Sequence, residues 1–394
     1  MKLSRPKSHR RVSALLALLI VATMALPAAA AAPSGAAAAG PVKLYLPIVT
    51  NNYASLSYRL GYASGGGLRS YPEAPSLRAG WYVDWTVQQK PARPNGIEYM
   101  PVVRVHQTLT CPLYSTNAHD RDLCPYAVPH SYIVSPSRDQ IASAARANRG
   151  QLWLIGNEMD RRDWPGGGQD EMLPELYAVA YNELYTLIKQ NDPTARVAIG
   201  GVIQATPLRL EYLSKVWTSY QQKYGAAMPV DVWNVHNFIL REEANKYGAG
   251  IPPGSNATSG VVYESDRTHI DMGIFDSQIR DFREWMRERG QQQKPLIVSE
   301  YGVLYAHEGL EDAATVGGFM ESTFDYFRTY RECGLGLASD GCRLVQRWNW
   351  YSLDDMHTSF NQYGALFNPK TGQITQTGAR FRDYAIKYQK ELGQ

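Results

Sequence analysis

Two glutamates, Glu158 and Glu300, stand out because each follows a short apolar run. The runs at 153–155 and 295–298 have the composition of strands buried on both faces, as in a parallel sheet. A carboxylate at the carboxyl end of such a strand occupies the place where barrel enzymes carry their chemistry. Two facing carboxylates could cleave a glycosidic bond, one by donating a proton to the leaving oxygen and the other by attacking or by activating water. The alternative is that each glutamate caps a helix or pairs with an arginine.

The rest of the sequence supplies elements that would bring these glutamates together. Eight segments have strand patterns, and most of them precede a helical pattern. The sequence therefore predicts an α/β fold, a single (β/α)8 barrel (TIM barrel), in which the fourth and seventh strands end across one mouth. The predicted strands are 58–63, 80–85, 99–105, 152–157, 196–200, 230–236, 296–300 and 344–348.

Helical periodicity predicts helices at 136–148, 173–190, 207–224, 274–288, 315–331 and 377–392. The helices after the first two strands should be short, because prolines interrupt both connections at Pro72, Pro75, Pro91 and Pro94. Long loops are expected after the third and sixth strands, at 109–134 and 239–272. Both loops lie on the catalytic face, where they could wall a substrate cleft.

Four stretches carry a resemblance to a known family: 81–85 (WYVDW), 99–103 (YMPVV), 156–160 (GNEMD) and 299–302 (SEYG). The chain resembles the clan A retaining glycoside hydrolases, and within them it is most similar to family 128, the endo-β-1,3-glucanases. The likeness covers most of residues 58–390 in strand order. It departs at Met159, where the family has proline, and at Arg104, where the third strand would end in an aromatic residue.

The resemblance implies a retaining mechanism with Glu158 as acid/base and Glu300 as nucleophile. The general acid then needs a raised pKa, which burial and the charge of Glu300 would give to Glu158. Asn157 is suited to bind a sugar 2-hydroxyl, or else it caps the next helix. The implied function is hydrolysis of β-linked glucan, internal and β-1,3.

Three further polar residues are candidates for substrate binding. His236 ends the sixth strand and could orient a carboxylate or bind a hydroxyl, or it could be structural. Tyr301 follows the proposed nucleophile and could donate to it, or could simply pack. Arg104, with His106 beside it, could reach hydroxyls or a uronic carboxylate, and its alternative is a salt bridge to Asp84.

Aromatic platforms for sugar rings are the next expectation, because sugars present apolar C–H faces. The chain has nine Trp and 26 Tyr against nine Phe, which favours aromatics with a polar group. Trp348, after the eighth strand, is the first candidate, followed by Trp85 and by Trp164 in the loop after Glu158. The alternative for each is a place in the core.

Metal and cofactor chemistry is not expected. The eight histidines show no H-E-x-x-H spacing. Ser299 lacks the G-x-S-x-G context of an esterase nucleophile, and no Gly-rich segment has the lysine of a phosphate loop. The sequence therefore predicts no metal and no cofactor.

The amino-terminal segment has the pattern of a secretory signal peptide. Residues 1–40 contain five basic residues and no acidic ones around an apolar run, so the formal charge of +3 becomes −2 once they are removed. An uncleaved anchor is the alternative. Residues 41–57 read as a linker or tether, and 58–394 as the barrel. The near-neutral charge of the mature chain argues against nucleic acid as a partner. We therefore expect a secreted or cell-surface monomer that binds polysaccharide or oligosaccharide, with no membrane span in the mature chain.

The four cysteines fall into two local pairs. In an exported chain the simplest of three connectivities is Cys111 with Cys124 and Cys333 with Cys342. Free or zinc-bound thiols are the alternative.

A different class of function also fits these observations. The chain could keep the barrel and its aromatic cleft as a non-catalytic secreted protein that binds glycan or a partner. Binding without turnover would distinguish this hypothesis from the enzyme.

Overall fold

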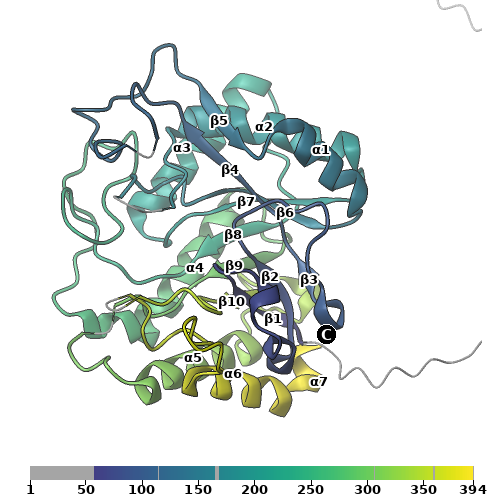
Figure 1. Ribbon diagram of the computed structural model, residues 1–394. Helices are drawn as coiled ribbons and strands as arrows, with labels where there is room; N and C mark the ends of the chain where they lie inside the picture. The colour runs from purple at the N-terminus through teal and green to yellow at the C-terminus, as the bar shows by residue number, and fades with distance from the viewer. Residues whose placement is uncertain (1–56, 114, 165–167, 306, 358–359, 394) are drawn as a thin grey trace, which may run out of the picture. The chain divides into compact units, whose positions relative to one another are not determined.

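Parallel strands alternate with helices along most of the chain in the computed structural model, which describes residues 57–113, 115–164, 168–305, 307–357 and 360–393 (Figure 1). The predicted signal peptide and nearly all of the predicted linker lie outside these residues. The α/β class expected from the sequence is confirmed.

Two sheets contain the strands. The first has six strands in the order β3-β2-β1-β10-β9-β8, and the second has four in the order β5-β4-β6-β7. All pairings are parallel except that of β4 with β5. The strands are β1 (Ser57–Ala63), β2 (Ala79–Val83), β3 (Glu98–Tyr99), β4 (Val102–Gln107), β5 (Tyr132–Ser135), β6 (Leu152–Asn157), β7 (Arg196–Gly201), β8 (Trp233–His236), β9 (Leu296–Glu300) and β10 (Arg347–Trp350).

The two sheets approach each other at both edges. Single parallel bridges from Ala198 to Val232 and from Val202 to Val235 join β7 to β8. At the other edge, only Met100 and Pro101 separate β3 from β4 along the chain. Proline has no backbone N–H to donate, which explains why the single strand expected at 99–105 is two short ones.

Three other strands differ clearly from the expectation, among them β8, which begins at Trp233 instead of at 230. β10 begins at Arg347 instead of at 344, because the carbonyl of Leu344 accepts a hydrogen bond from the Arg283 side chain. β5 was not expected at all, since it lies at the end of the loop predicted at 109–134. It folds back on β4 as an antiparallel hairpin, with Val105 opposite Val134.

The helices are α1 (Arg138–Ala147), α2 (Pro174–Asn191), α3 (Pro207–Tyr224), α4 (Met272–Glu288), α5 (Ala313–Thr329), α6 (Gln376–Lys387) and α7 (Gln389–Leu392). Figure 1 shows α5 and α6 beside the six-stranded sheet and α1 and α2 beside β4 and β6. In the described connections from β1 to β2 and from β2 to β3, the only helical segments are 3-10 turns, as the prolines there predict. None of the described helices is long and apolar enough to cross a membrane.

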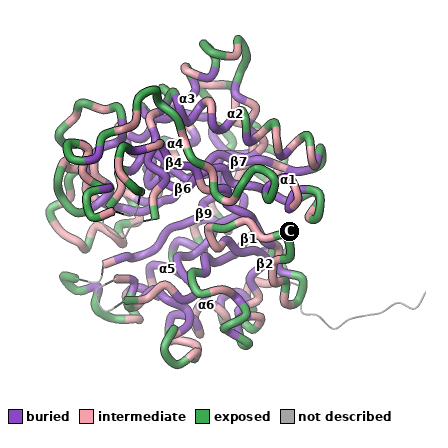
Figure 2. The backbone as a smooth tube through the Cα atoms, turned by 45° about the horizontal axis from the view of Figure 1, so that its top comes forward, coloured by how far each residue is buried: buried purple, intermediate pink, exposed green. Residues whose placement is uncertain are grey.

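The strands form the core. Figure 2 shows most of them buried, while exposed residues concentrate on the outer faces of helices and in loops; β5 is the exception, since none of its residues is buried. Every residue of β2, β6, β8, β9 and β10 is buried, so these strands have no solvent face. The unbroken apolar runs of the sequence are therefore strands buried on both faces, as predicted.

Both expected disulfides are present. Cys111 bonds to Cys124 with 5.6 Å between their Cα atoms, and Cys333 bonds to Cys342 with 4.7 Å. Each closes a short loop, and the first of them belongs to the connection between β4 and β5.

Candidate active site

Glu158 and Glu300 meet at the carboxyl ends of β6 and β9. Each is only 5% exposed. A carboxylate oxygen of Glu158, a carboxylate oxygen of Glu300 and a ring nitrogen of His236 all lie within 4.8 Å of one another. The chain turns at Glu158, whose φ of 53° is in the left-handed region, and its backbone N–H donates to Gly201 at 2.9 Å. This turn directs the side chain toward β9 instead of along the next connection.

His236 lies between the two carboxylates. Its Nδ1 is 3.2 Å from Glu158 Oε1, and its Nε2 is 3.6 Å from Glu300 Oε1. Burial alone would lower the pKa of His236, but Glu300 and Glu158 together raise it above its usual value. The ring packs against Gly201, where an added Cβ would lie 2.2 Å from the ring Cδ2. A glycine at the end of β7 is therefore what leaves room for the histidine.

Arg161 holds the second oxygen of Glu158. Its Nη1 is 3.1 Å from Glu158 Oε2, and its Nη2 donates to the carbonyl of Gly248 at 2.8 Å. Gln169 donates to the same carboxylate oxygen at 3.3 Å. Burial by itself would raise the pKa of Glu158, but Arg161 and His236 outweigh it and lower that pKa to about 2. The expectation that Glu158 has a raised pKa in the unliganded protein is therefore wrong.

Glu300 has the opposite electrostatic surroundings. Burial raises its pKa to about 7, and the negative charge of Glu158 adds to this, while His236 and a hydrogen bond from Trp85 act against it. The indole Nε1 of Trp85 donates to Glu300 Oε1 at 2.5 Å. Because Arg161 and His236 favour the ionised form of Glu158 while burial dominates at Glu300, Glu300 is the carboxylate that holds a proton to the higher pH.

Asn157 and Arg104 are both tied to the loop that follows β6. The Asn157 side chain donates to the carbonyl of Gly168 at 3.2 Å, and its backbone N–H donates to Asp170 at 2.9 Å. Arg104 forms a salt bridge to Asp170 with Nη2 and Oδ1 2.6 Å apart. The alternative partner considered for Arg104, Asp84, instead accepts hydrogen bonds from residues of its own region, including Tyr99.

Six aromatic side chains form a chain of ring contacts along the pocket. Each ring lies within 4.4–6.1 Å of the next, centroid to centroid, in the order Trp164, Tyr247, Tyr305, Phe360, Tyr351 and Trp85. The first and last of these were expected from the sequence. The other four lie in loops, where only tertiary contacts bring them together, although Tyr247 does fall in the long loop predicted at 239–272.

Two expected site residues face away from the pocket. Trp348 is fully buried, with its ring 5.1 Å from that of Phe327 in α5. Tyr301 is also fully buried, and its hydroxyl lies 3.0 Å from that of Thr323 in the same helix. For both residues the structure supports the alternative considered in the sequence analysis: their side chains pack against α5.

A pocket of about 510 Å³ contains the carboxylate pair. Asn157, Arg104, Trp85 and Trp164 line it, as do Arg161 and Gln169, which the sequence did not suggest. The two ring nitrogens of His236 face one carboxylate each.

The same three groups are where a cation could be held. Among the described residues, Glu158, His236 and Glu300 form a set whose ligand atoms converge closely enough for one metal ion. However, Arg161 already brings a positive charge to Glu158 at 3.1 Å, which opposes a second cation there. Hydrogen bonding and ion pairing within the protein account for this arrangement.

The chain is thus an α/β protein with a two-carboxylate site at the carboxyl ends of its parallel strands. Neither the protein-family models nor the curated proteins include a match to its sequence. Solved structures do match its fold. It is similar to the GH128 subgroup II endo-β-1,3-glucanase of Pseudomonas viridiflava, with a TM-score of 0.50, 14% identity, and coverage of 83% of this chain and 98% of that one.

Two further structures are similar at lower scores. A GH128 subgroup I endo-β-1,3-glucanase of Amycolatopsis mediterranei, in complex with laminaritriose, has a TM-score of 0.49 and 14% identity over 83% of this chain and 99% of that one. A family 39 glycoside hydrolase of Bacteroides cellulosilyticus has a TM-score of 0.47 and 11% identity over 84% and 64%. The resemblance to family 128 inferred from the four sequence stretches is confirmed at the level of fold.

Proposed function

We propose that this protein is a secreted glycoside hydrolase that cleaves internal β-1,3 bonds of β-linked glucan with retention of anomeric configuration. The observation that carries the proposal is that one carboxylate oxygen of Glu158 and one carboxylate oxygen of Glu300 lie within 4.8 Å of each other in one pocket. Retaining enzymes have carboxyl groups about 5–5.5 Å apart, whereas inverting enzymes need about 6.5–9.5 Å to admit a water. The short separation supports the retaining mechanism.

In the proposed reaction Glu300 attacks the anomeric carbon while Glu158 protonates the leaving oxygen, so the glycosidic C–O bond breaks as the ester bond forms. Water then attacks the glycosyl ester, gives a proton to Glu158 and releases Glu300. The aromatic side chains provide apolar surface for sugar faces. Asn157 and Arg104 supply polar groups at the pocket wall.

Before this reaction Glu158 must gain a proton and Glu300 must lose one, because Glu300 holds its proton to the higher pH. His236 is placed to do this. In the neutral form of His236 with its proton on Nδ1, Nε2 takes the proton of Glu300 while the Nδ1 proton passes to Glu158, so the imidazole ends with one proton, as it began. Substrate that displaces Arg161 or Gln169 from Glu158 Oε2 would favour the protonated acid.

The choice of substrate rests on the sequence resemblance and on the fold shared with the Pseudomonas viridiflava endo-β-1,3-glucanase. The parallel strands number eight when β3 and β4 are counted as one. The bridges between β7 and β8 and the short link from β3 to β4 support their closure into the expected barrel. Secretion is supported by the leader pattern and by the two disulfides, which persist in oxidising compartments.

The test is hydrolysis of laminarin-type β-1,3-glucan against cellulose, mannan and xylan, with Glu300→Ala and Glu158→Ala as paired variants. Each variant should lose about a thousandfold in kcat. Added azide then assigns the roles: it should give the α-glycosyl azide with Glu300→Ala and the β-glycosyl azide with Glu158→Ala. Wild-type rates in both variants on the best substrate would exclude the two-carboxylate mechanism, and exchanged azide products would exchange the roles.

The non-catalytic alternative has one structural observation in its favour. Glu158 is ion-paired to Arg161 and carries no proton at rest, which a binding protein tolerates and an acid catalyst must overcome. Calorimetric binding of β-1,3-glucan oligosaccharides by the wild-type protein, with no product after prolonged incubation, would select this function.

A further inference from the structure

Arg209 is a fully buried cation in the first turn of α3. Its guanidinium contacts five oxygen atoms on two other segments of the chain. Nε donates to Glu242 Oε1 at 2.9 Å, and Nη2 donates to the carbonyls of Ala249 and Gly250 at 2.7 Å and 2.6 Å. Nη1 donates to the carbonyl of Asp160 and lies 3.3 Å from Asp160 Oδ2. One side chain thus joins α3 to the turn after β6 and to the long loop after β8.

These bonds lie at both ends of a second contact, the one that holds Arg161. Arg161 Nη2 donates to the carbonyl of Gly248 at 2.8 Å, and its Nη1 is 3.1 Å from Glu158 Oε2. Arg209 binds the residue immediately before Arg161 and the two residues immediately after Gly248. The backbone on either side of the contact between Arg161 and Gly248 is therefore fixed by one guanidinium.

The two acids in contact with this guanidinium are themselves fixed. Asp160 and Glu242 are both fully buried. Asp160 accepts the backbone N–H of Ile203 at 3.3 Å, while Glu242 accepts the hydroxyl of Thr206 at 2.6 Å and the backbone N–H of Val261 at 3.1 Å. Apolar residues of similar volume often stabilise a buried site as well as such ion pairs do, so the cluster is better explained by the fixed directions of its bonds.

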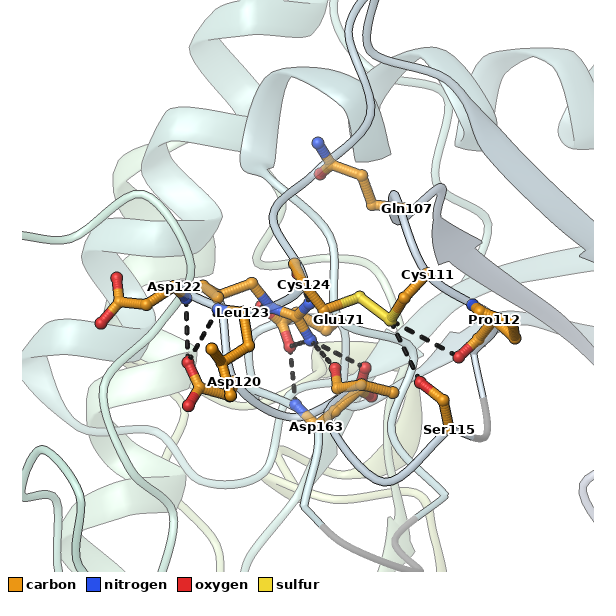
Figure 3. Close-up of a disulfide and its surroundings, with 12 residues drawn as sticks. Gln107, Cys111, Pro112, Ser115, Asp120, Asp122, Leu123, Cys124, Asp163 and Glu171 are labelled. Carbon is orange, nitrogen blue, oxygen red and sulfur yellow. Dashed lines mark hydrogen bonds and ion pairs between the residues drawn. A yellow bond between two sulfur atoms is a disulfide. The ribbon is translucent and has the colours of Figure 1, made fainter.

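The turn that carries Arg161 is also held from its other side, by the loop that the Cys111–Cys124 disulfide closes. The backbone N–H of Asp163 donates to Glu171 Oε2 at 2.7 Å (Figure 3). Arg121, from the disulfide loop, forms salt bridges to Asp163 at 3.2 Å and to Glu171 at 3.0 Å. Two anchors therefore flank Arg161 in sequence, and Arg209 holds the nearer one.

We propose that Arg209 is a positioning residue, which places Arg161 on Glu158 by fixing the chain at Asp160 and beyond Gly248. It acts through Arg161, because its own nitrogens are bound to the two acids and to the loop carbonyls. Without this support Arg161 would have to meet Glu158 from a turn and a loop that move independently, at a higher cost in conformational entropy. The effect on catalysis rests on the proposed function, whereas the effect on the position of Arg161 does not.

Position can be separated from charge at this site. The charged and titratable side chains around Glu158 come from its own turn and from the ends of β8, β9 and β10: Arg161, Asp160, His236, Glu300 and Tyr351. Arg209→Lys alters none of them and keeps a positive charge, but three donors on one nitrogen cannot reach both the Asp160 carbonyl and the loop carbonyls. A change at Arg161 in this variant therefore reports lost positioning.

The direct test is hydrogen exchange at the Arg161 guanidinium, followed by side-chain nitrogen NMR and assigned by the signals absent from Arg161→Gln. Exchange should be about tenfold faster in Arg209→Lys than in wild type, the change expected from the loss of one ordinary hydrogen bond. This measurement needs no substrate. Unchanged exchange would overturn the inference, whether or not the protein cleaves glucan.

Arg283→Lys is the matched control. Arg283 in α4 is also fully buried, and it donates to the carbonyls of Lys294 and Leu344, which precede β9 and β10 at the ends away from the carboxylates. This variant should lower the free energy of unfolding as Arg209→Lys does, but it should leave exchange at Arg161 as in wild type. Equal acceleration in the two variants would mean that Arg209 contributes only to stability, and would overturn its positioning role.

Catalysis gives a second readout. In Arg161→Gln the cation at Glu158 is gone, so the descending limb of the kcat/KM profile moves to higher pH. Arg209→Lys should move this limb in the same direction by up to about one pH unit, and the double variant should match Arg161→Gln alone, because no guanidinium is left to place. Additive shifts would show that Arg209 acts separately and would overturn the inference. If the wild type cleaves no glucan, the proposed function fails and the exchange measurement alone decides.

A change on the loop keeps the test decisive if Arg209→Lys does not fold. Gly248→Ala would place a Cβ 2.4 Å from the Arg241 carbonyl, at a φ of 137° that only glycine adopts readily, so the turn that presents the Gly248 carbonyl must shift. Gly250→Ala is its control, because apart from its chain neighbours no atom lies within 4 Å of the added Cβ. Exchange at Arg161 should rise about tenfold in Gly248→Ala and stay as in wild type in Gly250→Ala. Unchanged exchange in both would show that the loop fixed by Arg209 does not hold Arg161, and would overturn the inference.

Discussion

Arg161 donates to Glu158 Oε2 at 3.1 Å, three residues further along the same turn, and both side chains are nearly excluded from solvent. A buried carboxylate with a cation at this distance is stabilised as the anion. The proposed acid is thus ionised at rest, and its partner Glu300 carries the proton. The site is best described as a coupled pair with one proton, whose position other residues control.

Removal of this cation should shift the pH dependence of catalysis. In Arg161→Gln the pair loses the positive charge that favours its ionised form, so its proton is held to higher pH. The descending limb of the kcat/KM profile should move upward by about one pH unit, because a neighbouring opposite charge lowers a pKa by about 1–3 units. Arg161→Lys keeps a cation and should keep the wild-type limb. An unmoved limb in Arg161→Gln would show that this ion pair does not control the proton.

The same pair predicts how stability depends on pH. The pKa of Glu300 is raised from 4.5 to about 7, so the folded protein keeps a proton that the unfolded chain has lost. Stability from this group therefore falls as pH rises from 4.5 to 7, by up to about 3 kcal/mol. Glu300→Gln cannot titrate and should lose less stability between pH 5 and pH 8 than wild type. Denaturant unfolding at both pH values measures the difference, and equal losses would contradict the raised pKa.

The lowered pKa of Glu158 has the opposite effect on the pH dependence of stability, and this effect appears at acidic pH. Its pKa is lowered from 4.5 to about 2, so the stability that its ionised form contributes is present above pH 4.5 and is lost as pH falls toward 2. Glu158→Gln should remove this part of the acid destabilisation. His236 titrates close to the pair, which is why each variant is compared with wild type over the same pH interval.

The fit of His236 against β7 gives a prediction about position rather than charge. In Gly201→Ala the new Cβ would lie 2.2 Å from the His236 ring, so the ring must move from between Glu158 and Glu300. A displacement of this kind should lower kcat by about a hundredfold while KM changes little. Gly318→Ala is the control, because no atom lies within 4 Å of its added Cβ. Wild-type kcat in Gly201→Ala would show that His236 has no role in catalysis.

The parts of the structure that the sequence predicted well are those with a local cause. Strands β6 and β9 are apolar runs with Glu158 and Glu300 at their carboxyl ends, so the type of each strand and the place of its acid follow from composition and parallel-sheet geometry alone. The two disulfides follow from the short spacing of the cysteines together with the predicted secretory leader. Arg161 was overlooked although it is only three residues from Glu158, because nothing in the local pattern shows that the chain turns there with a positive φ.

The direction of a side chain from a fully buried strand has no local cause. Every residue of β10 is buried, so alternation of polar and apolar residues cannot reveal which ones face the sheet interior and which face the helices. Trp348 and Trp350 lie two residues apart, and both rings contact Phe324 of α5. Asn349 between them points the other way, toward Gly61 of β1. Shifting the register by one residue would have placed the tryptophans inside, and the sequence permits both choices.

The direction of the side chain distinguishes Trp164 from Trp348, although the sequence predicted a sugar platform for both. Trp164 is 42% exposed in the wall of the pocket that holds Glu158 and Glu300, whereas Trp348 is fully buried. Trp164→Ala should raise KM for β-1,3-glucan about tenfold with little change in thermal stability, because it removes a sugar platform and no core packing. Trp348→Ala should instead lower the free energy of unfolding by about 3–5 kcal/mol, the usual cost of a large cavity. Activity and denaturant unfolding of both variants form one experiment, and a loss of stability in Trp164→Ala with unchanged KM would remove this residue from the cleft.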